Sequence, residues 1–358
     1  MKTKAVCTAA GMLFACHAFA QSSVTISGLI DGGVSYVSNE GGGHTLKFDD
    51  GIAVPNLLKF TGKEDLGGGT RAVFELTNQF QLGNGSFMPG QSLFSRTAYV
   101  GLDDERFGRL TLGNQYDFMV DSLFFGYNDA ALYAAGVYDF RNGPFAKLAL
   151  PNNPTGAFDW DRMAGERITN SVKYQSANFG GFSAGAMYGF GGVPGSIGSG
   201  NASSFGLNYV NGAFGANAAY TLVKTATAGG QDSVRNWGVG THYHLGAVTL
   251  TGLFTTVHNN LNGAGIWQIE AGSVWQIGNL WSLSGAYSYM KGNTVVDDNH
   301  AHQLTAMLQY TLSKRTSVYV TTVYQRANQG ANALINDVMV ASSSASQFIG
   351  RIGMQTHF

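Results

Sequence analysis

The chain has 358 residues, of which 12% are charged, and it contains 50 glycines but only 6 prolines. The charged share is roughly half that of an ordinary soluble domain, and the formal net charge of −1 excludes the basic field on which nucleic-acid binding depends. Length alone would allow two soluble domains, but the composition argues against them.

The amino terminus has the pattern of a secretory signal peptide. A basic start (MKTK) precedes an apolar stretch too short to span a bilayer, and Ala-Phe-Ala at residues 18–20 forms a small-x-small cleavage site. We therefore expect residues 1–20 to be a cleaved signal peptide. A lipobox ending at Cys16 is the alternative, but the bulky Phe14 suits that motif less well than the two alanines suit signal cleavage.

Both cysteines, Cys7 and Cys16, lie in this amino-terminal segment. The mature chain would therefore lack disulfides, zinc–thiolate sites and cysteine nucleophiles, and we expect no cofactor. Its two lysines leave with the segment, so the 21 basic residues fall to 19 against 22 acidic ones. No run of about 18 apolar residues follows, so we expect no helical membrane span. Low charge without apolar runs in an exported chain fits a transmembrane β-barrel.

Apolar and polar residues alternate along most of the remaining chain. Examples are "VTISGLIDGGVSYVS" at residues 24–38, "GFSAGAMYGF" at 181–190 and "LWSLSGAYSYM" at 280–290. A period of two is the pattern of β-strands with unlike faces. The polar face consists of Ser, Thr, Asn and Gly, which suits a wet lumen better than a packed core. Trp281, Leu283 and Tyr287 should face lipid, and Ser284 should face water.

Turn signals divide residues 21–358 into strands. Short turns are expected at residues 64–69, 103–108, 178–181, 211–212, 245–246, 278–279 and 313–315, and long polar connections at 39–51, 191–201, 224–233, 291–300 and 327–344. Seven short turns joining eight long-looped hairpins predict an all-β fold: an antiparallel barrel of about 16 strands with both termini on the short-turn side. The last strand would pair with the first and so remove both sheet edges.

One connection is different from the others. Between residues 114 and 165 the alternation stops, and loops of that length are usually functional or disordered. The segment carries many aromatic residues together with six aspartates, at positions 117, 121, 129, 139, 159 and 161. The aromatic residues argue against disorder, and we therefore expect this constriction loop to fold into the barrel.

Basic residues stand on the polar faces of neighbouring predicted strands. They are Lys59, Lys63, Arg71 and Arg96. They could simply be solvated in the lumen, or they could face the aspartates of the long segment and create a transverse field across a constriction. Asp117 and Asp121 would then present their carboxylates to one side, if the local chain is helical.

Other motifs carry no catalytic or metal signal. Residues 181–185 (GFSAG) match a nucleophile elbow, but the match lies within an alternating strand instead of a strand-to-helix turn. His242 with His244, and His300 with His302, each form half of a possible metal site without a third ligand, so we expect no metal. Gly67–Gly69 lacks the Lys-Ser/Thr pair of a phosphate loop. We therefore do not expect an enzyme.

Several stretches together carry a family resemblance. "SSVTISGLIDGGVSY", "GKEDLGGGTRAVFEL", "SRTAYVGL", "GRLTLGNQYD", "NSVKYQSANFGGFSAGAMYGF" and the terminal Phe358 resemble the general trimeric porins of β-proteobacteria, in order and over nearly the whole mature chain. The resemblance implies a homotrimer of 16-stranded barrels in the Gram-negative outer membrane, in contact with outer-membrane lipid and lipopolysaccharide. It also implies a third extracellular loop that narrows each pore.

The resemblance also carries over to single residues. Arg71 and Arg96 match basic positions of the strand wall, and Asp117 matches an acid at the start of the loop. Leu57 and Asn114 stand where relatives often have arginine, so this chain has fewer matching cations and its ion preference stays open. Phe358 matches the terminal residue that the barrel-assembly machinery reads.

The expected function is therefore a water-filled channel for passive diffusion of small hydrophilic solutes and ions. Two alternatives remain. A substrate-selective channel for an anion or sugar would need a ladder of basic residues or a row of aromatic residues along the lumen. A secreted β-rich enzyme or lectin would need a polar exterior and a dry core.

Overall fold

The computed structural model describes residues 23–88, 92–150, 159–163, 167–227 and 230–358. Its strands are β1 (Ser23–Glu40), β2 (Gly43–Asp50), β3 (Leu57–Gly67), β4 (Thr70–Gln79), β5 (Thr97–Asp104), β6 (Gly108–Tyr116), β7 (Arg167–Gln175), β8 (Phe182–Gly189), β9 (Ala202–Asn211), β10 (Phe214–Thr227), β11 (Gly230–Leu245), β12 (Val248–Asn259), β13 (Gly265–Ile277), β14 (Trp281–Gly292), β15 (His300–Thr311), β16 (Thr316–Ala327) and β17 (Ser346–His357). The expected signal peptide and both cysteines lie outside the described residues.

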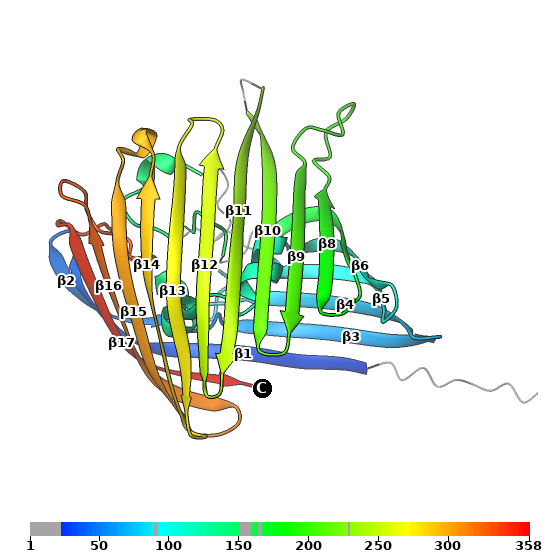
Figure 1. The fold of residues 1–358 in the computed structure, drawn as a ribbon, viewed down its shortest axis with the longest axis horizontal. Helices are drawn as coiled ribbons and strands as arrows, with labels where there is room; N and C mark the ends of the chain where they lie inside the picture. Colours follow the sequence, from blue (N-terminus) through cyan, green and yellow to red (C-terminus); the bar gives the residue numbers. More distant parts are fainter. Residues whose placement is uncertain (1–22, 89–91, 151–158, 164–166, 228–229) are drawn as a thin grey trace, which may run out of the picture.

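The described strands form one closed antiparallel barrel (Figure 1). From β3 to β17 each strand pairs with the next one along the chain, and β17 pairs with β1. The segments β2 and β3 both pair with the same edge of β1, so together they form one barrel strand. Of the 17 strand segments, two therefore share one position, and the barrel has sixteen strands, as the turn signals predict.

The predicted positions of the short turns are confirmed, but the predictions for two of the long connections are wrong. Residues 43–50 form strand β2 instead of a loop, and residues 224–227 and 230–233 extend β10 and β11. Residues 224–227 and 230–233 are mostly polar, and backbone pairing continues the hairpin through them: Lys224 lies opposite Ser233 and Thr225 opposite Asp232. In β2, Lys47 also pairs with Asp49 at 3.5 Å and Asp337 at 3.8 Å.

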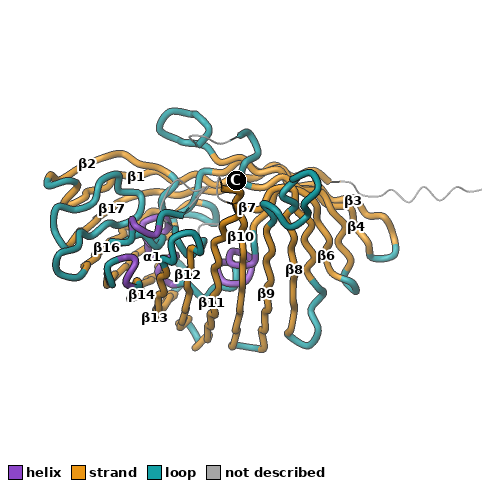
Figure 2. The backbone as a smooth tube through the Cα atoms, turned by 90° about the horizontal axis from the view of Figure 1, so that it is seen from above, coloured by secondary structure: helices purple, strands orange, loops and turns teal. Residues whose placement is uncertain are grey.

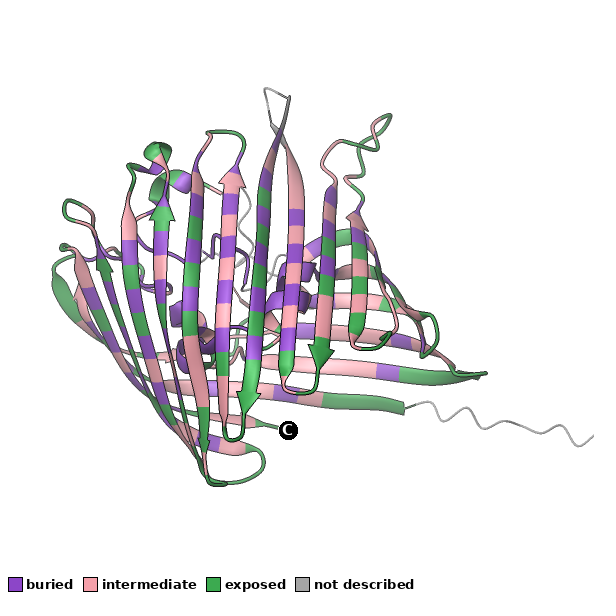
Figure 3. Cartoon of the chain, viewed as in Figure 1, coloured by how far each residue is buried: buried purple, intermediate pink, exposed green. Residues whose placement is uncertain are grey.

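The two faces of the sheet follow the predicted alternation (Figure 3). On β14, Trp281, Leu283 and Tyr287 are 44%, 40% and 46% exposed, whereas Ser284 is 6% exposed. We call the face of Trp281 the apolar face and the face of Ser284 the polar face. A large exposed apolar surface is unusual for a soluble protein, and it is what lipid contact requires.

One barrel strand is interrupted at residues 51–56, between β2 and β3. Asp31 on β1 lies opposite the break, and its carboxylate accepts hydrogen bonds from the backbone N–H of Ile52 (2.8 Å) and Ala53 (3.1 Å). The side chain of Asn56 accepts a hydrogen bond from the N–H of Asp31 at 2.8 Å. These bonds satisfy backbone groups that the missing strand pairing would leave without partners.

The described part of the long segment, residues 117–150 and 159–163, contacts the polar face of the barrel. In this segment lie η1 (Met119–Phe124), α1 (Ala130–Ala135), η2 (Gly136–Asp139) and η3 (Ala146–Leu148), and a further short helix, η4 (Thr294–Val296), lies between β14 and β15. Helix α1 packs against β13 to β16, and η1 packs against β9 to β11 (Figure 2). In the described part of the chain, no helix combines the length and the apolar character needed to cross a membrane.

The carboxyl terminus pairs with the first strand. Phe358 and Gly28 exchange two backbone hydrogen bonds, of 3.1 and 3.2 Å. A Cβ atom at Gly28 would lie 2.4 Å from the Phe358 ring, so only glycine leaves room for that ring. Phe358 is 49% exposed and continues the apolar row of Met354 and Ile352, as the period of two predicts.

Candidate functional site

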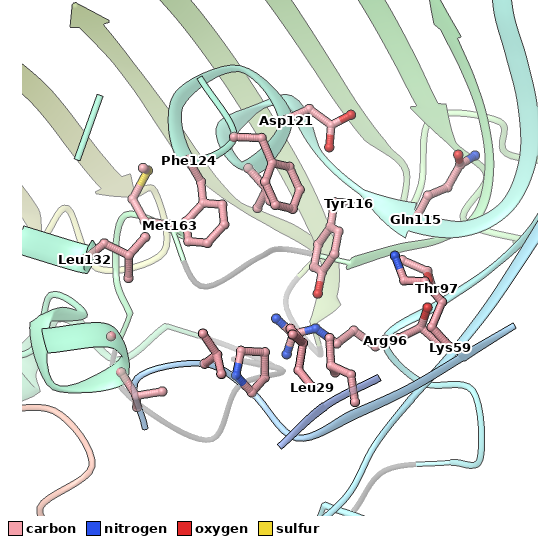
Figure 4. Close-up of a pocket in the computed structure, with 18 of the residues that line it drawn as sticks. Leu29, Lys59, Arg96, Thr97, Gln115, Tyr116, Asp121, Phe124, Leu132 and Met163 are labelled. Carbon is pink, nitrogen blue, oxygen red and sulfur yellow. The ribbon is translucent and has the colours of Figure 1, made fainter. Parts of the chain in front are cut away.

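A cavity of about 700 Å³ lies between the polar face of β3 to β7 and the segment of residues 117–163. Figure 4 shows Arg96, Lys59 and Thr97 on one side of it, and Phe124, Leu132 and Met163 on the other. The strand side is polar because the inward positions of the alternation carry charged and hydroxyl side chains. The opposite side is mostly apolar.

Charged side chains line the cavity from several elements. The cations are Lys59 on β3, Arg96 immediately before β5, Arg109 on β6 and Lys173 on β7, and the carboxylates are Glu75 on β4 and Asp121 in η1. Among the described residues, the lining thus has four cationic and two anionic side chains. We call this set the charged wall.

Three of the four cations of the charged wall pair with a carboxylate. Lys59 Nζ lies 3.2 Å from Glu75 Oε1, and Lys173 Nζ lies 2.5 Å from Asp121 Oδ2. Arg109 donates to a third carboxylate, that of Asp103, at 3.3 Å. These partners offset much of the local positive charge.

Arg96 is held differently. Its guanidinium donates to the side-chain oxygen of Gln79 and lies 5.7 Å from the centre of the Tyr116 ring. Both partners are uncharged. In the described part of the chain, no carboxylate lies within ion-pair distance of Arg96, so its charge remains available to the cavity.

The opposite wall is formed by the uncharged lining residues of 120–140 together with Met163 and residues 52–55. Phe124 and Phe125 make an edge-to-face pair with ring centres 4.8 Å apart. Tyr127 and Tyr133 stack with a centre distance of 6.1 Å and an interplanar angle of 3°. We call this set the apolar wall.

A buried ion network anchors the apolar wall to the barrel. Arg141 has a side chain that is 2% exposed, and it lies 2.8 Å from Asp129, 3.0 Å from Asp139, 3.2 Å from Asp161 and 3.0 Å from Glu270. Burial raises the pKa of the Asp139 carboxyl well above its ordinary value. Glu270 belongs to β13, so the network joins the segment to a strand.

Asp129, Asp139 and Glu270 bring carboxylate oxygens within 4.8 Å of one another, a spacing that could suit a metal ion. The Arg141 guanidinium already contacts all three. It supplies the positive charge that a cation would otherwise provide.

The first turn of the segment is fixed by Asp117. Its carboxylate is fully buried and accepts hydrogen bonds from the Thr221 hydroxyl at 2.6 Å and the Val120 N–H at 3.2 Å. The next residue, Phe118, donates its N–H to Ser204 at 2.9 Å. Both strand partners lie on the polar face, which fixes where η1 begins.

A second buried network lies beside residues 51–56. The Arg351 side chain on β17 is fully buried and contacts Asp31 at 3.0 Å, and it also donates to Asp49. The Tyr138 hydroxyl, from η2, donates to Ser35 at 2.8 Å. The end of the apolar wall is therefore tied to β1 and β17.

The six residues expected at a constriction do not lie together. Lys59, Arg96 and Asp121 line the cavity. Lys63 and Arg71 lie toward the short turn between β3 and β4, and Arg71 pairs with Asp103 and Glu105 there. Neither belongs to the cavity lining.

The expectation for Asp117 is wrong as well. Its carboxylate is buried against Thr221 and is not presented on the side of Asp121. A backbone hydrogen bond of 3.1 Å does join the Asp121 N–H to the Asp117 carbonyl, with the spacing expected for a helical turn. The two carboxylates nevertheless have different partners, Thr221 for Asp117 and Lys173 for Asp121.

Glu75, Arg109 and Lys173 also line the cavity and were not among the residues predicted from the sequence. Arg109 and Lys173 each occupy an inward position of an alternating strand, "GRLTLG" and "NSVKYQ", so the same alternation would have identified them. The apolar wall had no such signal, because its residues meet only through the fold of the long segment.

The other motifs have ordinary roles. Ser183 of the GFSAG match lies within β8, and the element that follows is strand β9, not a helix. His242 is buried and contacts Asn128, whereas His302 lies on the apolar face and contacts the Tyr287 hydroxyl. Neither pair of histidines gathers a carboxylate in the part of the chain that the structure describes.

Comparison with known proteins gives a consistent result. A family model described as Gram-negative porin matches residues 7–330. The chain is 30% identical over 313 residues to outer membrane porin protein 32 of Delftia acidovorans, covering 84% of this chain and 83% of that protein. It is 29% identical over 266 residues to an outer membrane porin protein of Bordetella pertussis, covering 66% of this chain and 64% of that protein.

Among solved structures, an anion-selective porin from Comamonas acidovorans superposes with a TM-score of 0.78 at 24% identity. The match covers 94% of this chain and 100% of that one. At this identity the likeness concerns the fold.

Proposed function

This chain belongs to the Gram-negative porin family, whose members are passive channels of the outer membrane, and on that premise we propose where its channel is narrowest and which ions it favours. The proposed constriction is the cavity between the charged wall and the apolar wall. The single observation that carries this proposal is that residues from both walls line one cavity of about 700 Å³. The long segment would then be folded into the pore.

The charge of this constriction favours anions. Four cations stand against two carboxylates in the lining, and low-dielectric walls strengthen the field of each charge in a narrow opening. Solutes would pass without tight binding because the remaining polar face offers hydration by hydroxyl and amide groups. No chemistry is required of the protein.

The position of the constriction can be tested by cysteine labelling, since the sequence from residue 21 onward contains no cysteine. Tyr133→Cys on the apolar wall should react with a bulky thiol reagent and lose more than half of its single-channel conductance. Phe205→Cys on the apolar face is the matched control and should keep its conductance. Equal conductances before and after labelling of Tyr133→Cys would place the constriction elsewhere.

We also propose that the protein assembles as a homotrimer in contact with outer-membrane lipid, including lipopolysaccharide. Cross-linking in native membranes, followed by electrophoresis of unboiled and boiled samples, tests the trimer. A single band at the monomer mass in both samples would contradict it.

Phe358 is proposed to be the assembly signal read by the barrel-assembly machinery. It ends the exposed apolar row of β17, whereas its neighbour His357 lies out of that row. Phe358→Asp should lower the folded outer-membrane fraction far more than His357→Asp does. Equal folded fractions in the two variants would exclude this role.

A further inference from the structure

We infer that the constriction selects amphipathic organic anions, in which a carboxylate is attached to an apolar or aromatic body, over hydrophilic anions of similar size. This inference rests on the proposed channel and specifies the solutes that it prefers. It is carried by the segregation of the lining into a charged wall and an apolar wall, with one cation left without a carboxylate.

The lining is segregated by structural element. The strands β3 to β7 contribute mainly charged, hydroxyl and amide side chains, while residues 120–140 contribute mainly aliphatic and aromatic ones, with Asp121 as the charged exception. A solute in the cavity therefore meets polar groups on one side and apolar groups on the other. Binding sites for small molecules typically combine an apolar surface with a few placed polar groups, at volumes of roughly 300–1,000 Å³.

The apolar wall exposes aromatic surface toward the cavity. Phe125, Tyr127 and Tyr133 are 54%, 60% and 44% exposed. A merely hydrophilic pore gains nothing from such surface, since water contact with apolar groups is unfavourable. A solute with an apolar face would cover it.

The aromatic rings are ordered before any solute arrives. Phe124 packs edge-to-face on Phe125, and Tyr127 stacks on Tyr133. The backbone beneath them is fixed by the Asn128 side chain, which donates to Asn217 on β10 at 3.0 Å. Little conformational entropy would therefore be lost when a ring or alkyl group packs against this wall.

Arg96 supplies the charged end of the site. The lining carboxylates Glu75 and Asp121 are already paired with Lys59 and Lys173. Among the described residues, the guanidinium of Arg96 contacts the neutral partners Gln79 and Tyr116, so a solute carboxylate can pair with it in a bidentate fashion. Arg96 and Phe124 stand on opposite sides of the cavity in Figure 4.

A sugar fits this site less well. The C–H face of a sugar could stack on the aromatic rings, but its hydroxyls would need free hydrogen-bond acceptors, and Glu75 and Asp121 are paired with their lysines. The uncompensated guanidinium favours a negative solute. We therefore assign the preference to amphipathic carboxylates.

The test compares benzoate with gluconate, both as potassium salts, by reversal potentials in planar bilayers under bi-ionic conditions. The wild-type channel should favour benzoate over gluconate by on the order of fivefold more than free diffusion predicts, the size expected for one aromatic packing contact. Phe125→Ser combined with Tyr133→Ser should abolish that excess, whereas Phe205→Ser on the apolar face should keep both the excess and the chloride conductance. Arg96→Gln should instead lower the permeability to both organic anions.

The outcomes separate this inference from the function on which it rests. A channel that conducts chloride but treats benzoate and gluconate according to size alone would contradict the selectivity and leave the proposed channel intact. An excess for benzoate that survives the double serine variant would also overturn it. A saturable block by a neutral sugar such as maltose, without any excess for benzoate, would assign the aromatic wall to sugars instead. Absence of any conductance would refute the proposed channel itself.

Discussion

The cationic side chains inside the barrel fall into two regions that differ in burial and in the number of partners. Arg141 and Arg351 have side chains that are 2% and 0% exposed, and each contacts two or more carboxylates. Lys59 and Arg109, which line the cavity, have side chains that are 35% and 43% exposed, with one close partner each. Buried cations therefore anchor the long segment to the barrel, whereas half-exposed cations face the cavity.

The difference has a physical reason. Removing an ion from water is costly, so a buried guanidinium must be surrounded by carboxylates and hydrogen bonds before it can be stable. A half-exposed cation keeps part of its hydration and needs fewer partners. Burial and partner number, more than residue type, thus separate anchoring charges from charges that can act on a passing ion.

The largest expected effect is on the anchoring region. Arg141→Gln should lower the free energy of unfolding by about 3–5 kcal/mol, because it leaves several buried carboxylates without their cation. Arg109→Gln, with a half-exposed side chain, should change it by less than about 1 kcal/mol. Urea unfolding in lipid vesicles measures both. Similar losses for the two variants would remove the distinction between the regions.

The second largest expected effect tests whether a cation is tolerated on the polar face but not on the apolar face. Leu283→Arg places a cation on the apolar face and should cost about 2–4 kcal/mol if the site lies near the middle of the bilayer. Ser284→Arg places the same cation on the polar face and should fold nearly as well as the wild type while altering conductance. A more damaging Ser284→Arg in the same unfolding assay would mean that the faces are reversed.

The next expected effect is smaller and concerns the pH dependence of stability that the buried Asp117 carboxyl produces. Burial raises the pKa of the Asp117 carboxyl from 3.8 to about 6, and the hydrogen bonds from Thr221 and Val120 offset only part of that rise. The folded protein thus holds a proton that the unfolded chain loses above about pH 4. Stability due to this group is therefore highest in acid, falls as the pH rises from about 4 to about 6, and stays lower above that range.

The asparagine in Asp117→Asn cannot ionise. The variant should therefore lack this pH-dependent change in the free energy of unfolding, which amounts to up to roughly 3 kcal/mol for a shift of about two pKa units. Urea midpoints at about pH 4 and pH 7 make the comparison, and an unchanged slope in Asp117→Asn would show that Asp117 is already ionised in the folded state.

Much of the barrel could be predicted from the sequence. The period of two gave the correct face to Trp281, Leu283 and Ser284, and glycine-rich turns located the short connections. These signals are local, since each depends on neighbouring residues only. Strand ends such as residues 224–227 and 230–233 were missed because pairing between polar strands leaves no apolar trace.

The site was less predictable because it depends on contacts between distant residues. Asp117 matches an acid of related loops, yet its environment is set by Thr221, more than a hundred residues away. Lys173 and Arg109 could have been found from the alternation, whereas the apolar wall could not. Its aromatic residues indicated that the segment is ordered, but not which surface it would form.

The central claim is that Arg96, Arg109 and Asp121 act on ions in the constriction. Reversal potentials in a potassium chloride gradient test it most directly. Arg96→Gln combined with Arg109→Gln should shift the potential toward cation selectivity, because two cations leave the lining. Asp121→Asn should shift it in the opposite direction, and Asp117→Asn should leave it unchanged. Unchanged potentials in the first two variants, or a shift in Asp117→Asn as large as that in Asp121→Asn, would contradict the assignment of this cavity as the selective constriction.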